Sequence, residues 1–183
     1  MFLQLAEWLE LQRASTALRE SLYMYPLLES VHVWALTLFV GLVAILDLRL
    51  LGVALRRVPV SDVQKRLFPW TMAGFAIMFA TGLLLFYAIP IRTYHSVWFR
   101  AKVIFLALAA LNAWLFHTGI YRRVAEWDLA TLIPRRARAA GLVSLILWTG
   151  VIFLGRMIAY SWFDCDVPQS ALVSFLASCP PRP

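Results

Sequence analysis

The sequence predicts an all-α fold: an integral membrane antiparallel four-helix bundle preceded by an N-terminal amphipathic helix. The 183 residues are 62% hydrophobic and 15% charged, with a mean hydropathy of +0.74, whereas soluble domains are nearer half apolar and a quarter charged. Four apolar stretches reach the roughly 20 residues that a spanning helix needs: 26–55, 69–90, 97–121 and 139–162. The short connections between them favour antiparallel packing of neighbouring helices.

Residues 1–22 predict an amphipathic surface helix and not a cleaved signal peptide. Apolar residues recur there with a partly helical period, and charged residues interrupt any apolar core that a signal peptide would need. These charged residues are Glu7, Glu10, Arg13, Arg19 and Glu20. A helix of this kind lies on the membrane surface or docks against a partner subunit.

The four spanning helices form one domain, residues 23–163. The first apolar stretch is longer than the hydrocarbon core requires, so we expect it to tilt or protrude. Prolines mark the helix boundaries, because proline breaks the backbone hydrogen-bond pattern of a helix. Pro59 follows the first helix, Pro90 ends the second and Pro134 precedes the fourth.

The tail, residues 164–183, contains both cysteines of the chain, Cys165 and Cys179. In an oxidising compartment they are expected to form a disulfide, and two free thiols are the alternative. The closed loop of about 15 residues would stabilise the fold by about 3 kcal/mol through chain entropy. We expect residues 168–178 to form a short surface helix held by this bond.

The net charge of +7 is concentrated in two loops. Basic residues fill the first and third loops: Arg56, Arg57, Lys65, Arg66, Arg122, Arg123, Arg135, Arg136 and Arg138. By the positive-inside rule these loops face the cytoplasm, which makes both termini periplasmic in a multi-pass protein of the bacterial inner membrane. No nucleic-acid-binding motif accompanies the arginines, so the lipid bilayer is the expected partner.

Polar groups within the apolar stretches indicate a site, because a charge at the centre of a spanning helix costs about 2.5 to 3.5 kcal/mol. His32 lies about 9 Å below the outer end of the first helix at 1.5 Å per residue. Four more residues fall near the same end and complete an outer cluster: Glu29, His95, Lys102 and Arg156.

A second polar cluster is predicted at the inner end, from Asp47, Arg49, Arg122 and His117. The third helix carries His117 about 28 Å further in than its start. His32 and His117 are therefore not expected to share one metal ion. For Asp47 and Arg49 the favoured interpretation is an ion pair within the helix or at the cytoplasmic edge.

The outer cluster predicts a haem b site. Haem between membrane helices needs one or two axial ligands, usually histidine, and basic groups for its propionates. We expect His32 and His95 as axial ligands of the iron, and Lys102 and Arg156 at the propionates. Met157 or Met24 is the alternative sixth ligand, or the iron is five-coordinate. In a purely structural alternative, His32 bonds a neighbouring helix, Glu29 pairs with Arg156 and Lys102 extends to the surface.

Two groups of residues resemble known families. The chain resembles the membrane protoporphyrinogen oxidase and copper resistance D type families in three places: Val31-His32-Val33-Trp34 through Gly41 to Arg49-Leu50, Trp98 to Lys102, and His117. Over residues 26–162 the chain also resembles a family of uncharacterised four-helix bacterial membrane proteins. The positions that carry this resemblance are 47–52, Lys102, Asn112, His117 and Gly155-Arg156. The oxidase resemblance implies haem b on His32 with Lys102 nearby, and the copper resemblance implies His32, Met24 and Met157 as ligands.

Three functions follow in order of preference. The first is a small membrane haem b protein, a cytochrome b that transfers electrons at the periplasmic side between a periplasmic redox partner and quinone. The second is a non-catalytic accessory subunit, which would pack through its N-terminal helix in a larger membrane complex or a homo-oligomer. The third is a copper-handling membrane protein.

Overall fold

The computed structural model describes residues 1–183 except 1, 129–132, 161–162, 164, 166–167 and 180–183. The described residues form helices and no strand, so the all-α prediction is confirmed. The α-helices are α1 (Phe2–Glu10), α2 (Arg13–Glu20), α3 (Met24–Leu50), α4 (Val60–Ala88), α5 (Pro90–His95), α6 (Val97–Leu115), α7 (Val124–Trp127), α8 (Arg135–Met157) and α9 (Ala171–Ala177).

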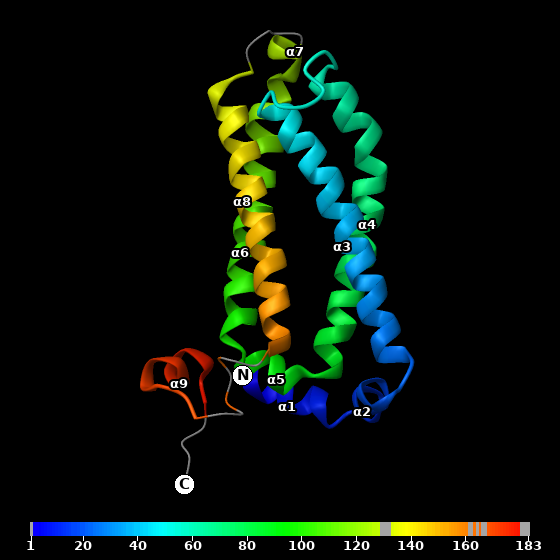
Figure 1. Ribbon diagram of the computed structural model, residues 1–183, viewed down its shortest axis with the longest axis vertical. Coiled ribbons are helices and arrows are strands. Elements are labelled where there is room, and N and C mark those ends of the chain that lie inside the picture. The colour runs from blue at the N-terminus through cyan, green and yellow to red at the C-terminus, as the bar shows by residue number, and fades with distance from the viewer. Residues whose placement is uncertain (1, 129–132, 161–162, 164, 166–167, 180–183) are drawn as a thin grey trace.

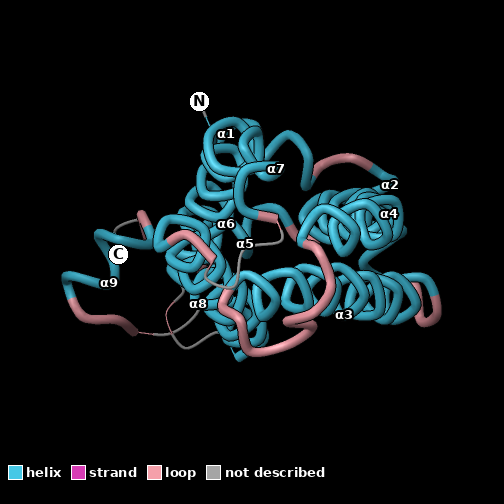
Figure 2. Tube along the Cα trace, turned by 90° about the horizontal axis from the view of Figure 1, so that it is seen from above, coloured by secondary structure: helices cyan, strands magenta, loops and turns pink. Residues whose placement is uncertain are grey.

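The four long helices form two antiparallel pairs, α3 with α4 and α6 with α8, and α3 also contacts α8 (Figures 1 and 2). Four helical segments are each long and apolar enough to cross a membrane: 24–50, 60–88, 97–127 and 135–160. This length and composition fit a multi-pass membrane protein, as the sequence predicts. The end of the predicted fourth span, at residue 162, lies outside the described residues.

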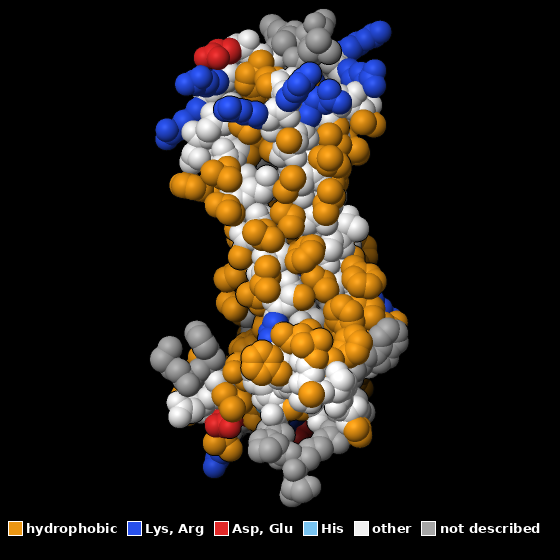
Figure 3. Space-filling model, turned by 90° about the vertical axis from the view of Figure 1, so that its left-hand side faces the viewer, with side chains coloured by type: hydrophobic (Ala, Val, Ile, Leu, Met, Phe, Trp, Pro, Cys, Tyr) orange, Lys and Arg blue, Asp and Glu red, His pale blue; other side chains and the backbone are white. Residues whose placement is uncertain are grey.

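The two helix pairs are joined at the end where α3 ends and α8 begins, called here the basic end. A buried apolar cluster fills this end: Leu50, Val60, Phe116, Trp127 and Ala137. Basic side chains gather over this end of the surface, and apolar side chains cover the bundle below it (Figure 3). The opposite end, which carries α5, is called the α5 end.

Helix α4 begins earlier than its apolar stretch suggests, at Val60 and not at Pro69, which lies inside the helix. Interior proline removes one helical hydrogen bond, but membrane helices tolerate it where neighbouring groups satisfy the freed backbone. Asp128 caps the new start, since its carboxylate accepts hydrogen bonds from the Ser61 N–H (3.0 Å) and the Ser61 hydroxyl. The cap accounts for helical structure ahead of the apolar residues.

The N-terminal segment is helical as expected, but it divides into α1 and α2. The chain turns between them, and an Arg19–Glu10 ion pair joins the two helices. The buried Ser15 hydroxyl donates to the Tyr87 carbonyl at 2.8 Å, which satisfies a carbonyl in the last turn of α4. Helix α1 packs on α5, so the pair lies across the α5 end (Figure 1).

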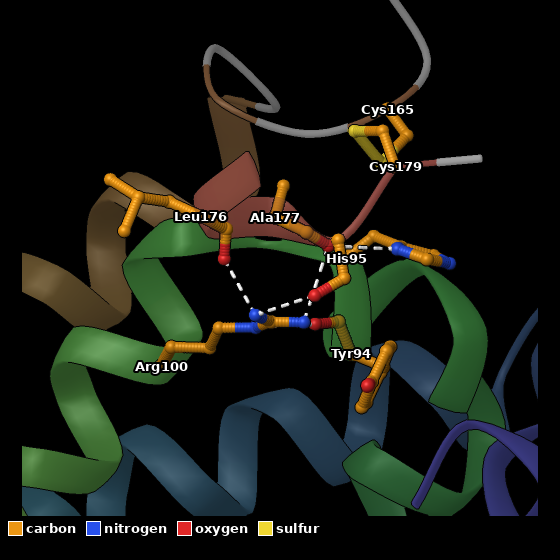
Figure 4. Close-up of a disulfide and its surroundings, with 8 residues drawn as sticks. Tyr94, His95, Arg100, Cys165, Leu176, Ala177 and Cys179 are labelled. Atoms are coloured by element: carbon orange, nitrogen blue, oxygen red, sulfur yellow. Dashed lines mark hydrogen bonds between the residues drawn. A yellow bond between two sulfur atoms is a disulfide. The ribbon is translucent and has the colours of Figure 1, made fainter. Parts of the chain in front are cut away.

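The predicted disulfide between Cys165 and Cys179 is present, with an S–S distance of 2.06 Å. It closes a segment that contains α9, the short helix expected in this region. Arg100 of α6 donates hydrogen bonds to the Leu176 carbonyl (2.6 Å), the Ala177 carbonyl (3.2 Å) and the Ser178 hydroxyl (3.1 Å) (Figure 4). A cation at the last carbonyls of a helix is favourable, so Arg100 anchors α9 to the bundle.

Candidate functional site

His32 is positioned by the contact between α3 and α4. Its Nδ1 atom lies 2.9 Å from the Thr81 hydroxyl oxygen. The single hydroxyl proton of Thr81 is directed at the Ile77 carbonyl, 2.7 Å away, with the Met78 carbonyl at 3.1 Å. Thr81 therefore accepts from His32, so a neutral imidazole carries its proton on Nδ1. The ring also makes a hydrogen bond to the Met78 backbone. With the proton on Nδ1, the lone pair is on Nε2.

Glycine lets the His32 ring lie close against α4. A Cβ atom at Gly82 would be 3.2 Å from Cε1 of His32, which is closer than ordinary van der Waals contact. The same pair of helices also approaches closely at Gly74, where a Cβ would lie 3.2 Å from the backbone nitrogen of Phe39. Small residues at such interfaces allow membrane helices to pack tightly, and here they fix the orientation of the imidazole.

Lys102 of α6 supplies a positive charge near His32. Its Nζ atom would be 3.3 Å from a Cβ at Gly155 of α8, so the absence of a side chain there leaves room for the ammonium. The charge is near enough to act on the imidazole electrostatically. Lys102 makes no hydrogen bond or ion pair with the described residues. The structure thus brings together His32 from one helix pair and Lys102 from the other.

The other two residues of the predicted haem site make different contacts. His95 of α5 donates through Nδ1 to the Ala177 carbonyl at 2.9 Å, so its ring lies against α9 (Figure 4). Arg156 donates to the Tyr160 hydroxyl at 3.2 Å, and its guanidinium lies 5.2 Å from the centre of the Tyr160 ring. Glu29 is beside Tyr25. The structure does not bring His95 or Arg156 into contact with His32.

Asp47 and Arg49 are both 4% exposed, but they do not pair with each other in the described part of the chain. Residues two apart on a helix point to different sides. The Arg49 Nε–H donates to the Val58 carbonyl at 2.7 Å, while the Asp47 carboxylate faces Ser144 of α8. Oδ2 of Asp47 is buried without a hydrogen-bond partner.

His117 lies near the basic end, beside the cluster residue Phe116, and far along the bundle from His32. Its Nδ1–H donates to the Ala113 carbonyl at 2.9 Å, and Nε2 faces the Gln64 amide nitrogen at 3.3 Å. The Nε2 lone pair of His117 therefore faces the Gln64 amide donor, whereas the side-chain partner of His32 is the Thr81 hydroxyl at Nδ1. This difference separates the two imidazoles chemically as well as in position.

Two features of the site were missed by the sequence reasoning. Thr81 was not singled out, because a threonine in a spanning helix can bond its own preceding turn and carries no signal by itself. Trp98, one helical turn before Lys102, has a buried indole N–H without a hydrogen-bond partner.

Among the described residues, no group of three or more His, Cys, Asp or Glu side chains is arranged to hold a metal ion.

A family profile matches residues 20–161, under the description "Family of unknown function (DUF6644)". The chain belongs to DUF6644. No curated protein and no solved structure matches it. The resemblance to the oxidase and copper resistance families finds no support in these comparisons, whereas the resemblance to an uncharacterised membrane family fits the match. The DUF6644 match includes His32, Thr81 and Lys102, while all of α1, all of α2 except Glu20, and the disulfide-closed tail lie outside it.

Proposed function

We propose that this DUF6644 protein is a small membrane haem b protein that transfers electrons at the α5 end of the bundle. The observation that carries the proposal is the orientation of His32. Protein histidines that bind a metal commonly donate one ring N–H to a fixed acceptor, which sets the tautomer and leaves the other nitrogen as ligand. The bond from His32 to Thr81 has this form, and Nε2 is the nitrogen left for iron.

Lys102 fits the second requirement of a haem site. Haem propionates are carboxylates, and an ammonium that bonds a carboxylate in an apolar setting makes a strong, charge-assisted hydrogen bond. The Lys102 ammonium has no described protein partner and room beside Gly155. His32 would hold the iron, Lys102 would hold a propionate, and bound haem would supply one-electron redox chemistry.

His95 is not among the residues that would hold the haem. His95 keeps a lone pair on Nε2, because its Nδ1 donates to a carbonyl, but its ring lies against α9. His32 would therefore be the histidine that holds the haem, with an electron partner at the same end of the bundle. We infer quinone or a periplasmic redox protein as that partner.

The orientation belongs to the same proposal. We infer that the basic end faces the cytoplasm of a bacterium and that both termini are periplasmic, because basic residues flanking spanning helices are retained on the cytoplasmic side. The gathering of basic side chains at one end supports this orientation (Figure 3).

A reduced-minus-oxidised absorption spectrum of the purified protein, expressed with haem supplied, tests the function. We expect a sharp α band in the wild type, its loss in His32→Ala and its retention in the matched control His117→Ala. Only one polar ring is removed in each variant, so both should insert and be recovered in full. A wild type that is fully recovered without haem would overturn the proposal and favour an accessory subunit. Loss of the band in His117→Ala alone would move the site to the basic end.

A further inference from the structure

A hollow of about 310 Å³ lies at the basic end, where α3 ends and α8 begins. Its lining consists of Leu51, Arg135, Arg138, Ala139 and Leu142. The two arginines are three residues apart in the first turns of α8, a spacing that places side chains on the same face of a helix. Both are exposed, and neither has an ion pair with the described residues.

The hollow is electropositive for more than one reason. No acidic side chain belongs to its lining. Helix α8 begins at Arg135, directly after Pro134, so the first turn of the helix presents unsatisfied N–H groups and the positive end of the helix dipole. Two guanidinium groups beside a helix N-terminus suit an anion such as phosphate, which arginine binds through paired N–H donors.

The lower half of the same hollow is apolar. Leu142, one turn after Arg138 and about 6 Å further along the axis, is 50% exposed, and Ile146 continues the apolar face at 58% exposed. The change from basic to apolar surface along the bundle is visible in Figure 3. An ion without a hydrocarbon tail would use only the upper half of this surface, whereas a phospholipid would use both halves.

We propose that this hollow binds one anionic glycerophospholipid, with its phosphate between Arg135 and Arg138 and an acyl chain along Leu142 and Ile146. The headgroup would lie at the membrane surface of the basic end, where clustered basic residues attract anionic lipids. The lipid would join the end of α3 to the start of α8, since Leu51 lines the same hollow. This site is independent of haem at His32, which lies toward the opposite end of α3.

Native mass spectrometry in a neutral detergent tests the proposal with three probes: phosphatidylglycerol, phosphatidylcholine and inorganic phosphate. We expect the wild type to retain one phosphatidylglycerol with at least about tenfold preference over phosphatidylcholine. The double variant Arg135→Gln/Arg138→Gln should lose most of this preference. The matched control Arg122→Gln/Arg123→Gln removes the same charge from the same end, outside the hollow, and should keep it. Equal losses in the two double variants would overturn the site and indicate diffuse charge attraction.

A third variant separates a lipid from a free anion. Leu142→Trp fills the apolar half of the hollow without changing its charge, so it should weaken phosphatidylglycerol retention while leaving any phosphate binding unchanged. Phosphate that binds the wild type as tightly as the lipid, or lipid binding that Leu142→Trp leaves intact, would contradict the proposal. Circular dichroism of each variant should give the helix content of the wild type, since all these side chains are exposed.

Discussion

At His32 the hydrogen bond to Thr81 contributes to which ring nitrogen is available, and its acceptor can be removed without changing the ring. Thr81→Val deletes the hydroxyl that accepts from Nδ1, so the imidazole keeps only its hydrogen bond to the Met78 backbone and is held less firmly. Loss of such an outer partner commonly lowers metal affinity about 10- to 100-fold. We expect haem titration of Thr81→Val to show weakened binding, while Thr81→Ser, which keeps the hydroxyl, should bind as the wild type does. Unchanged affinity in Thr81→Val would mean that Thr81 does not orient a ligand.

Two cations near the α5 end can be compared directly. Lys102 has no described partner, while Arg156 already contacts Tyr160. A hydrogen bond to a charged group contributes about 1.5 to 3 kcal/mol, so Lys102→Gln should weaken haem binding by about tenfold or more. Arg156→Gln should leave haem affinity within about twofold of the wild type. If Arg156→Gln weakens haem binding more than Lys102→Gln does, Arg156 would be the residue at the propionates, as the sequence predicts.

The sequence could indicate His32 and Lys102, because an imidazole or an ammonium in an apolar helix has a cost that demands a reason. It placed His95 and Arg156 with them because counting residues along a helix gives depth only. Depth does not reveal which neighbour a side chain faces. The contacts of His95 with α9 and of Arg156 with Tyr160 depend on how the elements pack, and no local pattern records that.

Between helices, the contact of α6 with α8 depends on a glycine. A Cβ at Gly150 would lie 2.3 Å from the Phe105 ring, so the ring would have to move, and overpacking typically costs about 1 to 3 kcal/mol. Gly150→Ala should therefore lower the thermal unfolding temperature in detergent. At Gly41 a Cβ would meet nothing within 4 Å, so Gly41→Ala should keep that temperature or raise it, because alanine favours helix over glycine. Equal effects of the two substitutions would show that Phe105 adapts freely.

The start of α4 should be sensitive to acid. Burial alone would raise the pKa of Asp128, but hydrogen bonds from Ser61 and from the Val60 backbone outweigh it and hold the pKa below its ordinary value. A carboxylate with a lowered folded-state pKa stabilises the fold above its unfolded pKa, near 4, and loses this contribution as pH falls through the folded value. Asp128→Ala should lower stability at neutral pH by about 1 kcal/mol. Thermal unfolding of the two proteins should converge below about pH 4, and a constant difference would contradict this role.

Helix existence was predictable, whereas helix ends were not. Apolar stretches report the part of a helix that lies in lipid, and a helix can continue beyond it wherever a cap is available. The cap for Ser61 comes from Asp128, 67 residues later, and no local signal at Val60 reveals it. Likewise, the N-terminal segment divides into α1 and α2 where the Ser15 hydroxyl donates a hydrogen bond to the Tyr87 carbonyl. Only the folded chain brings these two residues together.

For the whole molecule, the sequence predicted an antiparallel bundle but not its pairing. Consecutive apolar helices are expected to lie side by side, yet they can be arranged in several ways around a bundle. The structure selects the pairs α3/α4 and α6/α8, with a direct contact of α3 and α8 at Gly141, where a Cβ would lie 3.1 Å from the Asp47 carbonyl oxygen. That pairing places His32 and Lys102 on different pairs, so any ligand held by both would bridge them.

The orientation of the bundle can be tested with single cysteines on a background in which Cys165 and Cys179 remain paired. Asp62 and Arg92 are exposed positions near opposite ends, Asp62 in the first turn of α4 and Arg92 in α5. Because basic residues near spanning helices stay on the cytoplasmic side, a membrane-impermeant thiol reagent added to intact cells should label Arg92→Cys and spare Asp62→Cys. Permeabilised cells should label both, which controls for access to each thiol. Labelling of Asp62→Cys alone in intact cells would reverse the topology and place the His32 end of the bundle in the cytoplasm.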